Sequence, residues 1–313
     1  MNRLKALVVL IAALMLALPA MAEELNLVDL MDTYYGSGNW TYRTGVGTGS
    51  DIGPALSAGL TQLRSSQGRG IIKVPAGHWL YTTAVSPSLL SGNYIVGEGS
   101  QASVIVYNAN YGGAFYWSGY QGYSGGGMRG IAILLEKQLG DTNAYALLVQ
   151  GDATYQSDQM AFEDIYISSI EGNSYWWAGL QVYGNARTSP QGIRVITIKN
   201  MQIFACHYFG AYFSNLVQAS IENLGVYSGK PQTTGMDVWL TGGGSASTNS
   251  IYVSIDALNV GGAVHLDNIS NVALHGNVGS LITGSSATYV SGWLHAPSVT
   301  GSVGSNSNLT IQN

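Results

Sequence analysis

Charged residues and cysteines are scarce in this chain of 313 residues. Only 9% of the residues are charged, and no lysine or arginine follows Lys230. Nucleic-acid binding depends on clustered basic side chains that neutralise phosphates, so this composition excludes a nucleic-acid partner. Cys206 is the only cysteine, which excludes an internal disulfide and leaves packing to stabilise the fold.

Long apolar runs are also missing, except at the amino terminus. Arg3 and Lys5 precede an apolar run over residues 7–18, and the small-residue sequence Pro-Ala-Met-Ala follows at 19–22. This order is typical of a secretory signal peptide, and the run is short for a membrane span. We therefore expect residues 1–22 to be cleaved and the mature protein to be secreted, extracellular or periplasmic, without membrane contact. An uncleaved membrane anchor is the alternative.

Glycine and aromatic residues are abundant in place of charge. The chain has 42 Gly, 20 Tyr and 7 Trp residues. With so few charges, the exposed polarity must come mainly from Ser, Thr, Asn, Gln and Tyr. Such a surface suits neutral or weakly charged sugars, so we expect a polysaccharide or a cell-surface glycan as the partner.

Two short patterns alternate along the chain. The first has an apolar residue on each side of a corner residue, which is Gly130, Asp164, Asn200, Asn223, Ala257 and Asn271 in its six copies. The second is a small residue followed by alternating apolar residues, and it begins at Ala146, Gly179, Gly210, Gly235 and Ala263. Alternation with a period of two predicts short strands that bury one face.

Strands of this kind, joined by segments of variable length, are typical of a solenoid whose rungs repeat the same strands. Asn and Asp suit a corner because they tolerate the left-handed backbone conformation. We predict an all-β fold, a single-stranded right-handed parallel β-helix, over residues 23–283. A β-sandwich is the alternative. The Gly/Ser/Asn-rich residues 284–313 are expected to form a final rung, a tail or an interface in a homotrimer.

A helix is predicted before the first strands. Pro54 suits the first turn of a helix, and Ala55, Leu56, Leu60 and Leu63 form an apolar stripe that would cap the open end of the solenoid.

The segment after this helix, Gly-Arg-Gly-Ile-Ile-Lys-Val-Pro-Ala-Gly-His-Trp-Leu-Tyr at 68–81, resembles the entry into the pectin-lyase-like β-helices. That superfamily includes pectate-lyase-type enzymes and phage tailspike depolymerases. The resemblance is specific over residues 51–107, and the repeats extend it to about residue 274. Upstream, residues 45–51 lack the usual Gly-Asp-Gly of the family.

The second pattern predicts the candidate site. Aligning its copies places Tyr212, Asp237 and His265 in one outward row, and in the resembled superfamily the polysaccharide cleft commonly runs along such a face. The predicted catalytic residues are Asp237, His265, Tyr212 and Asp267, and the predicted substrate-binding residues are Trp239, Tyr183, Gln181, Trp176 and Trp177. The alternative is that Asp237 and His265 only satisfy each other on a polar outer wall.

Two reactions are compatible with these residues. Asp237 with Asp267 or Glu222 could hydrolyse a glycosidic bond as an acid pair. His265 or Tyr212 could instead start a β-elimination beside a uronic acid carboxylate, which needs a cation. Few basic residues are near, so we favour a hydrolase over a lyase and expect no metal or cofactor, unless Ca²⁺ supplies the charge for a lyase.

A non-catalytic reading of the same face stays open. The chain would then be a glycan-binding or adhesion module, or a receptor-binding protein similar to a virion tailspike. In the first pattern, the outward residues before the corner are Arg129, Glu163, Lys199, Glu222, Asp256 and Ser270. They predict a ladder of surface ion pairs, with Glu222 and Asp256 as an acid pair as the alternative.

Overall fold

The computed structural model describes residues 23–66, 69–109, 112–118, 125–137, 144–151, 158–170, 174–184, 194–216, 218–227, 236–242, 253–284, 287–304 and 307–312. The expected signal peptide lies outside these ranges. None of the helices within them combines the length and apolarity needed to span a bilayer.

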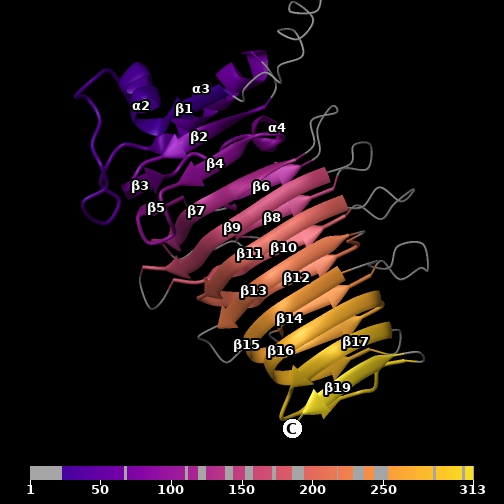
Figure 1. The fold of residues 1–313 in the computed structure, drawn as a ribbon. Helices are drawn as coiled ribbons and strands as arrows, with labels where there is room; N and C mark the ends of the chain where they lie inside the picture. Colours follow the sequence, from indigo (N-terminus) through magenta and orange to yellow (C-terminus); the bar gives the residue numbers. More distant parts are fainter. Residues whose placement is uncertain are drawn as a thin grey trace, which may run out of the picture.

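The described strands form one parallel sheet that winds into a right-handed β-helix, which confirms the predicted fold (Figure 1). The rungs stack from the helices at the amino-terminal end to β19 at the carboxyl-terminal end. The strands are β1 (Glu23–Asn26), β2 (Gly70–Val74), β3 (Gly77–Tyr81), β4 (Tyr94–Gly97), β5 (Ser103–Tyr107), β6 (Phe115–Ser118), β7 (Gly126–Leu135), β8 (Tyr145–Gln150), β9 (Asp158–Ser169), β10 (Trp176–Tyr183), β11 (Arg194–Phe204), β12 (Cys206–Ser214), β13 (Ala219–Tyr227), β14 (Met236–Thr241), β15 (Val253–Asp267), β16 (Ser270–Thr283), β17 (Thr288–His295), β18 (Val299–Thr300) and β19 (Asn308–Gln312).

The corner residues of the first pattern stack on one another as predicted in five of the six copies. The pairing of β7, β9, β11, β13 and β15 aligns Gly130, Asp164, Asn200, Asn223 and Ala257. All five have a positive φ, between 51° and 65°. The Asn223 Nδ2 donates a hydrogen bond to the Asn200 Oδ1 at 3.0 Å, so these two amides connect neighbouring rungs at the corner.

The sixth copy is placed wrongly by the sequence pattern. Asn271 does have a positive φ of 56°. However, Val272 pairs with Val253 and with Val290, so Asn271 lies at a different corner, beside Tyr289. The short interval to the preceding copy had already made this repeat irregular.

Within the described residues, three helices lie at the amino-terminal end: α2 (Leu27–Tyr35), α3 (Ile52–Ser66) and α4 (Pro87–Leu90). The predicted capping helix is confirmed as α3, although it begins two residues before Pro54. Leu56, Leu60 and Leu63 are fully buried over the first rung. The sequence patterns missed α2, which packs against α3 where Gly59 leaves room for Leu30.

A buried ion pair fixes the loop between α2 and α3. The Glu136 carboxylate follows β7 and is fully buried, and it pairs with the Arg43 guanidinium. The same carboxylate accepts hydrogen bonds from the Gly47 N–H at 2.9 Å and the Asn108 Nδ2 at 2.6 Å. With these partners the buried charge is compensated, and the loop is held against the side of the solenoid.

The solenoid continues past residue 283. Strand β17 pairs with β16, β18 with β16, and β19 with β17. The domain boundary at residue 283 stays a prediction.

Candidate functional site

The strands β8, β10, β12 and β14 and the end of β15 form one outer face of the solenoid. Their register aligns Gln181, Tyr212, Trp239 and His265 in one outward column. The alternate residues, such as Val238 and Val264, are buried in the core. Four of the predicted site residues therefore lie on successive rungs, about 4.8 Å apart.

Aromatic rings run without interruption along this face. The ring centroids of Tyr212 and Trp239 are 5.4 Å apart, and Phe209 lies 5.4 Å from Tyr212 and 5.5 Å from Trp239. The imidazole of His265 stacks on the indole of Trp239 at 5.6 Å and 13°. Tyr212, Trp239 and His265 are all partly exposed, so their rings form a surface open to a ligand.

The row continues toward the start of β12. Trp177 stacks on Tyr208 at 4.6 Å and 6°, and lies 5.7 Å from His207. Tyr208 contacts Phe209 edge to face at 4.3 Å. We call the whole set the aromatic strip: Trp177, His207, Tyr208, Phe209, Tyr212, Trp239 and His265.

His207, Tyr208 and Phe209 were missed at the level of sequence. The second pattern placed the start of the strand at Gly210, whereas β12 begins at Cys206. The run His-Tyr-Phe directly before the pattern was the available signal.

The predicted row of Tyr212, Asp237 and His265 is wrong in register. Ala211 pairs with Val238, and Val238 pairs with Val264, so Trp239 and not Asp237 lies between Tyr212 and His265. The slip is two residues. Because strand side chains alternate with a period of two, a slip of two leaves the apolar pattern unchanged and cannot be detected from it.

Asp237 lies at the corner of the rung and not on the open face. Its exposed fraction is 6%, and its carboxylate occupies the space that a side chain at Gly262 would fill. The buried thiol of Cys206 is near enough for the Asp237 charge to raise the pKa of that thiol further, beyond the larger effect of burial.

The candidate carboxylates are not brought together as an acid pair. Asp237 lies opposite Ala263, four residues before Asp267, because Val238 pairs with Val264. At about 3.3 Å per residue, the two Asp Cα atoms are roughly 13 Å apart or more along the strand. Glycosidases hold their two carboxyl groups about 5 to 10 Å apart. Glu222 lies on another face, where it pairs with Lys199 at 3.0 Å.

Trp176 is a second correction. Its side chain is fully buried, its ring stacks on Tyr107 at 5.6 Å, and its Nε1 donates to the Ser168 carbonyl oxygen at 2.9 Å. It therefore belongs to the core, while its neighbour Trp177 belongs to the strip. The backbone of Tyr183 pairs with that of Ser214, and the register continues through Thr241 to Asp267. The predicted role of Tyr183 in substrate binding stays a prediction.

The predicted ladder of charges forms on a different face. We call this the ladder face, and define it by the outward residues Arg129, Glu163, Lys199, Glu222 and Asp256, which the register aligns. Arg129 pairs with Glu163, and Lys199 with Glu222. Ser270 does not continue the column. His275 takes that place, with its Nδ1 3.6 Å from the Asp256 Oδ1.

These ion pairs are largely exposed, so each contributes little to stability. Glu222 and Asp256 are neighbours on this face, and each has a basic partner. In the part of the chain that the structure describes, no three His, Cys, Asp or Glu side chains gather to hold a metal. The Ca²⁺ ion expected for a lyase stays a prediction.

Comparison with known proteins shows a likeness of fold. No known protein-family model matches this chain, and no curated protein sequence matches it. The A-module of a mannuronan C-5 epimerase from Azotobacter vinelandii superposes with a TM-score of 0.54 at 14% identity, over 88% of this chain and 77% of that module. A tailspike protein of an Acinetobacter baumannii bacteriophage, a capsular polysaccharide depolymerase, gives 0.55 at 11% identity, over 94% of this chain.

This chain spans 58% of the length of that tailspike. At such identities the likeness shows the fold alone. The predicted resemblance to parallel β-helix proteins that act on polysaccharides is confirmed at that level.

Proposed function

We propose that this protein binds polysaccharide along the aromatic strip. The observation that carries the proposal is the row of ring contacts from Trp177 to His265, in which Phe209 is buried and connects the partly exposed rings on either side of it. Aromatic side chains present flat apolar surfaces, which fit the C–H faces of sugar rings. The strip crosses β10, β12, β14 and β15, a span of about 14 Å at the spacing of neighbouring strands.

Two further observations support this class of ligand. The strip contains no lysine, arginine or carboxylate, so it suits a ligand held by stacking and hydrogen bonds. The two proteins of similar fold act on mannuronan and on capsular polysaccharide, according to their names. With the expected signal peptide, the ligand would be met outside the cell or in the periplasm.

Cleavage of the bound polysaccharide is the second candidate function. His265 and Asp267 alternate with the buried Leu266 and therefore share the outer face, and Tyr212 lies two rungs from His265. A His or Tyr side chain can remove a proton as a general base. The separation of Asp237 and Asp267 removes support from hydrolysis by that pair. Elimination started by His265 or Tyr212 is the other candidate reaction, and on a uronic acid it would depend on a cation such as Ca²⁺.

Binding tests the proposal most directly. Residues 23–313 would be titrated with dextran, laminarin, polygalacturonate and alginate. For the polysaccharide that binds, we expect Trp239→Ala and Trp177→Ala each to lower the affinity by about tenfold or more, as for other buried aromatic contacts. Tyr34→Ala, an exposed aromatic on α2, is the matched control and should bind like the wild type. Unchanged affinity in both tryptophan variants would refute the proposal.

Product analysis then separates binding from cleavage. New reducing ends and new unsaturated bonds would be followed with the wild type and with His265→Ala. Unsaturated product that is lost in the variant supports elimination at the strip. Reducing ends without unsaturation would mean hydrolysis, and binding without any product would retire the catalytic candidate.

A further inference from the structure

A groove crosses the last rungs of the solenoid on the ladder face. It has a volume of about 530 Å³, and its lining includes Ser254, Asn271, Ala273, Tyr289, Ser291 and Asn308. We call it the C-terminal groove. Its volume lies within the range of small-molecule sites in proteins, about 300 to 1,000 Å³.

The floor of the groove is a row of small side chains on four neighbouring strands. The register aligns Ser254 of β15 with Ala273 of β16, Ser291 of β17 and Asn308 of β19. The floor is therefore about 14 Å long, measured along the solenoid axis. It is separate from the aromatic strip, because β15 passes a corner at Ala257 and a register shift after Val260 before it reaches His265.

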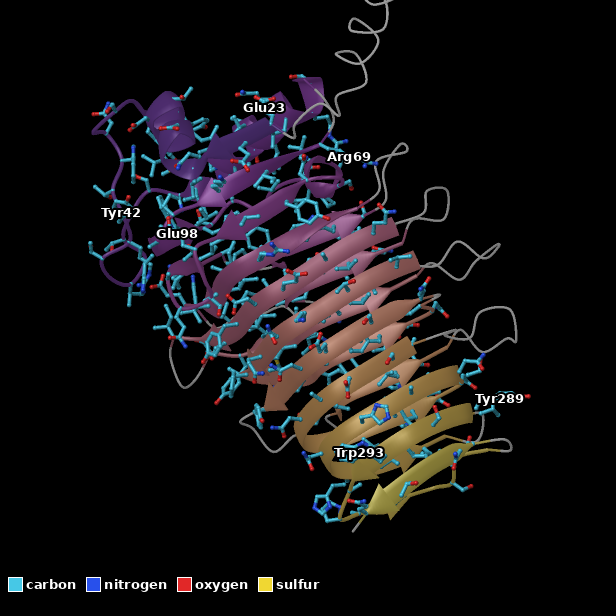
Figure 2. The ribbon with its side chains drawn as sticks, viewed as in Figure 1. Glu23, Tyr42, Arg69, Glu98, Tyr289 and Trp293 are labelled. Carbon is cyan, nitrogen blue, oxygen red and sulfur yellow. The ribbon has the colours of Figure 1, made fainter. Side chains whose placement is uncertain are left out.

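Two exposed aromatic side chains lie near the floor on β17: Tyr289 belongs to the lining of the groove, and Trp293 lies just beyond that lining. Tyr289 and Trp293 lie two residues before and two residues after Ser291, and their exposed fractions are 52% and 44%. Figure 2 shows both on the last rungs, with Tyr289 projecting from the edge of the ribbon. The imidazole of His275 lies 6.2 Å from the Trp293 ring. A sugar ring bound in the groove would meet the Tyr289 ring, and a segment that extends past the lining would reach Trp293.

The backbone at Tyr289 is in the left-handed region, with a φ of 52°. A bulky aromatic residue rarely adopts this conformation, and such strain persists only where the surrounding structure imposes it. The neighbouring rung places Asn271, with a φ of 56°, at the same corner. Earlier rungs place Gln159, with a φ of 57°, and Val195, with a φ of 53°, at the same corner, so the winding of the rungs imposes this conformation whatever the residue. Asn also tolerates it, so Asn can replace Tyr289 without loss of the fold.

Charge ends where the groove begins. The column that carries Lys199, Glu222 and Asp256 continues as His275, Trp293 and Thr310, and no charged residue follows Asp267 in the sequence. The polar lining side chains Ser254, Asn271, Ser291 and Asn308 are neutral and exposed. Hydroxyl and amide groups both donate and accept hydrogen bonds, which matches sugar hydroxyls and offers nothing specific to an ion.

We propose that the C-terminal groove is a second saccharide-binding site, specific for an uncharged oligosaccharide segment. Tyr289 stacks on a sugar ring in the groove, Trp293 contacts the part of the segment that extends past the lining, and the hydroxyl and amide groups of the lining bind the sugar hydroxyls. This proposal depends on the proposed function for the class of ligand, a saccharide. Its location does not depend on it, because the groove and the aromatic strip share no residue.

The test uses variants that keep the fold. Tyr289→Asn introduces the residue type found at this corner in the preceding rung, Asn271. Trp293→Thr introduces the residue type that pairs with Trp293 in the next rung, Thr310. Residues 23–313 carrying both changes would be titrated with dextran, laminarin and galactomannan as uncharged probes and with alginate as the anionic probe. Trp239→Ala reports on the strip in parallel. We expect the double variant to lose about tenfold or more in affinity for an uncharged probe, with a melting temperature no lower than that of the wild type.

The outcomes separate the two sites. If the double variant binds uncharged probes like the wild type and Trp239→Ala does not, the groove proposal is wrong and the proposed function stands. If only the double variant loses affinity, the groove is the binding site and the strip proposal fails. A wild type that binds none of the uncharged probes overturns the groove proposal, while alginate binding that depends on Trp239 would still support the strip.

Discussion

Burial decides what the Cys206 thiol can do chemically. The Cys206 thiol is fully buried at the start of β12, and burial raises its pKa, because the thiolate would lose its hydration. The nearby Asp237 carboxylate raises that pKa further. A thiol held in the neutral form is a poor nucleophile. Cys206 is therefore a small core residue, although a lone cysteine in a sequence can suggest a reactive group.

This raised pKa makes stability depend on pH. Above about pH 9 the unfolded chain releases the thiol proton and the folded chain keeps it, so the free energy of unfolding falls as pH rises, by up to about 1.4 kcal/mol per pH unit. Urea unfolding between about pH 7 and about pH 10 would measure this. We expect Cys206→Ala to lose less stability than the wild type over the alkaline part of the range. Parallel curves for the two proteins would contradict the prediction.

The corners determine how each rung turns. Gly130, Asp164, Asn200 and Asn223 are residue types that adopt a positive φ with little strain. Their stacking also lets Asn223 bond Asn200 across the rungs. Ala257 and Tyr289 adopt the same conformation without such a side chain. The sheet pairing on both sides of these corners must therefore impose the backbone there.

Asn223→Val tests the corner at an exposed position. Valine is strained in the left-handed conformation, so we expect Asn223→Val to lower the free energy of unfolding by about 1 to 2 kcal/mol. Asn223→Gly is the control. It loses the same hydrogen bond to Asn200, but glycine adopts the left-handed conformation without strain. Its free energy of unfolding should therefore lie closer to that of the wild type. Equal stabilities of the two variants in urea unfolding would contradict the prediction, because they would show that the positive φ at position 223 does not disfavour valine.

On the scale of the whole molecule, charge is distributed unevenly. The ion pairs that involve Lys or Arg on the ladder face end at Lys199–Glu222, and residues 268–313 contain no Lys, Arg, Asp or Glu. The amino-terminal end is covered by α2 and α3 (Figure 1), while the rungs at the other end carry the C-terminal groove. Both candidate sites therefore lie on surfaces that depend on rings and neutral polar groups. A homotrimer formed through these last rungs stays a prediction.

Binding to an uncharged polysaccharide should accordingly be insensitive to salt. We expect the affinity to change by less than about twofold between about 0.05 M and about 0.5 M NaCl, because screening acts on charges that neither site presents to such a ligand. Calorimetric titration at the two salt concentrations would measure it. A steep loss of affinity with salt would mean that charged groups outside the two sites dominate binding.

The sequence by itself determined the class of fold, the amino-terminal cap and most of the rungs. Alternating apolar residues specify strands with one buried face, and the corner residues set the bend within β7, β9, β11, β13 and β15 at five of six predicted positions. Local chemistry is enough for these features because each rung repeats the same contacts with its neighbours. Sequence also picked out Gln181, Tyr212, Trp239 and His265 as neighbours on one face.

Only the tertiary structure decided the register and the depth of each side chain. A slip of two residues preserves the apolar alternation, so no pattern could show that Trp239 and not Asp237 lies between Tyr212 and His265. Burial of Trp176 and Asp237 depends on how neighbouring rungs close over them, and the pairing of His275 with Asp256 depends on which rung follows which. The C-terminal groove exists for the same reason, because its floor is made of residues from four strands that only the stacking of the solenoid brings together.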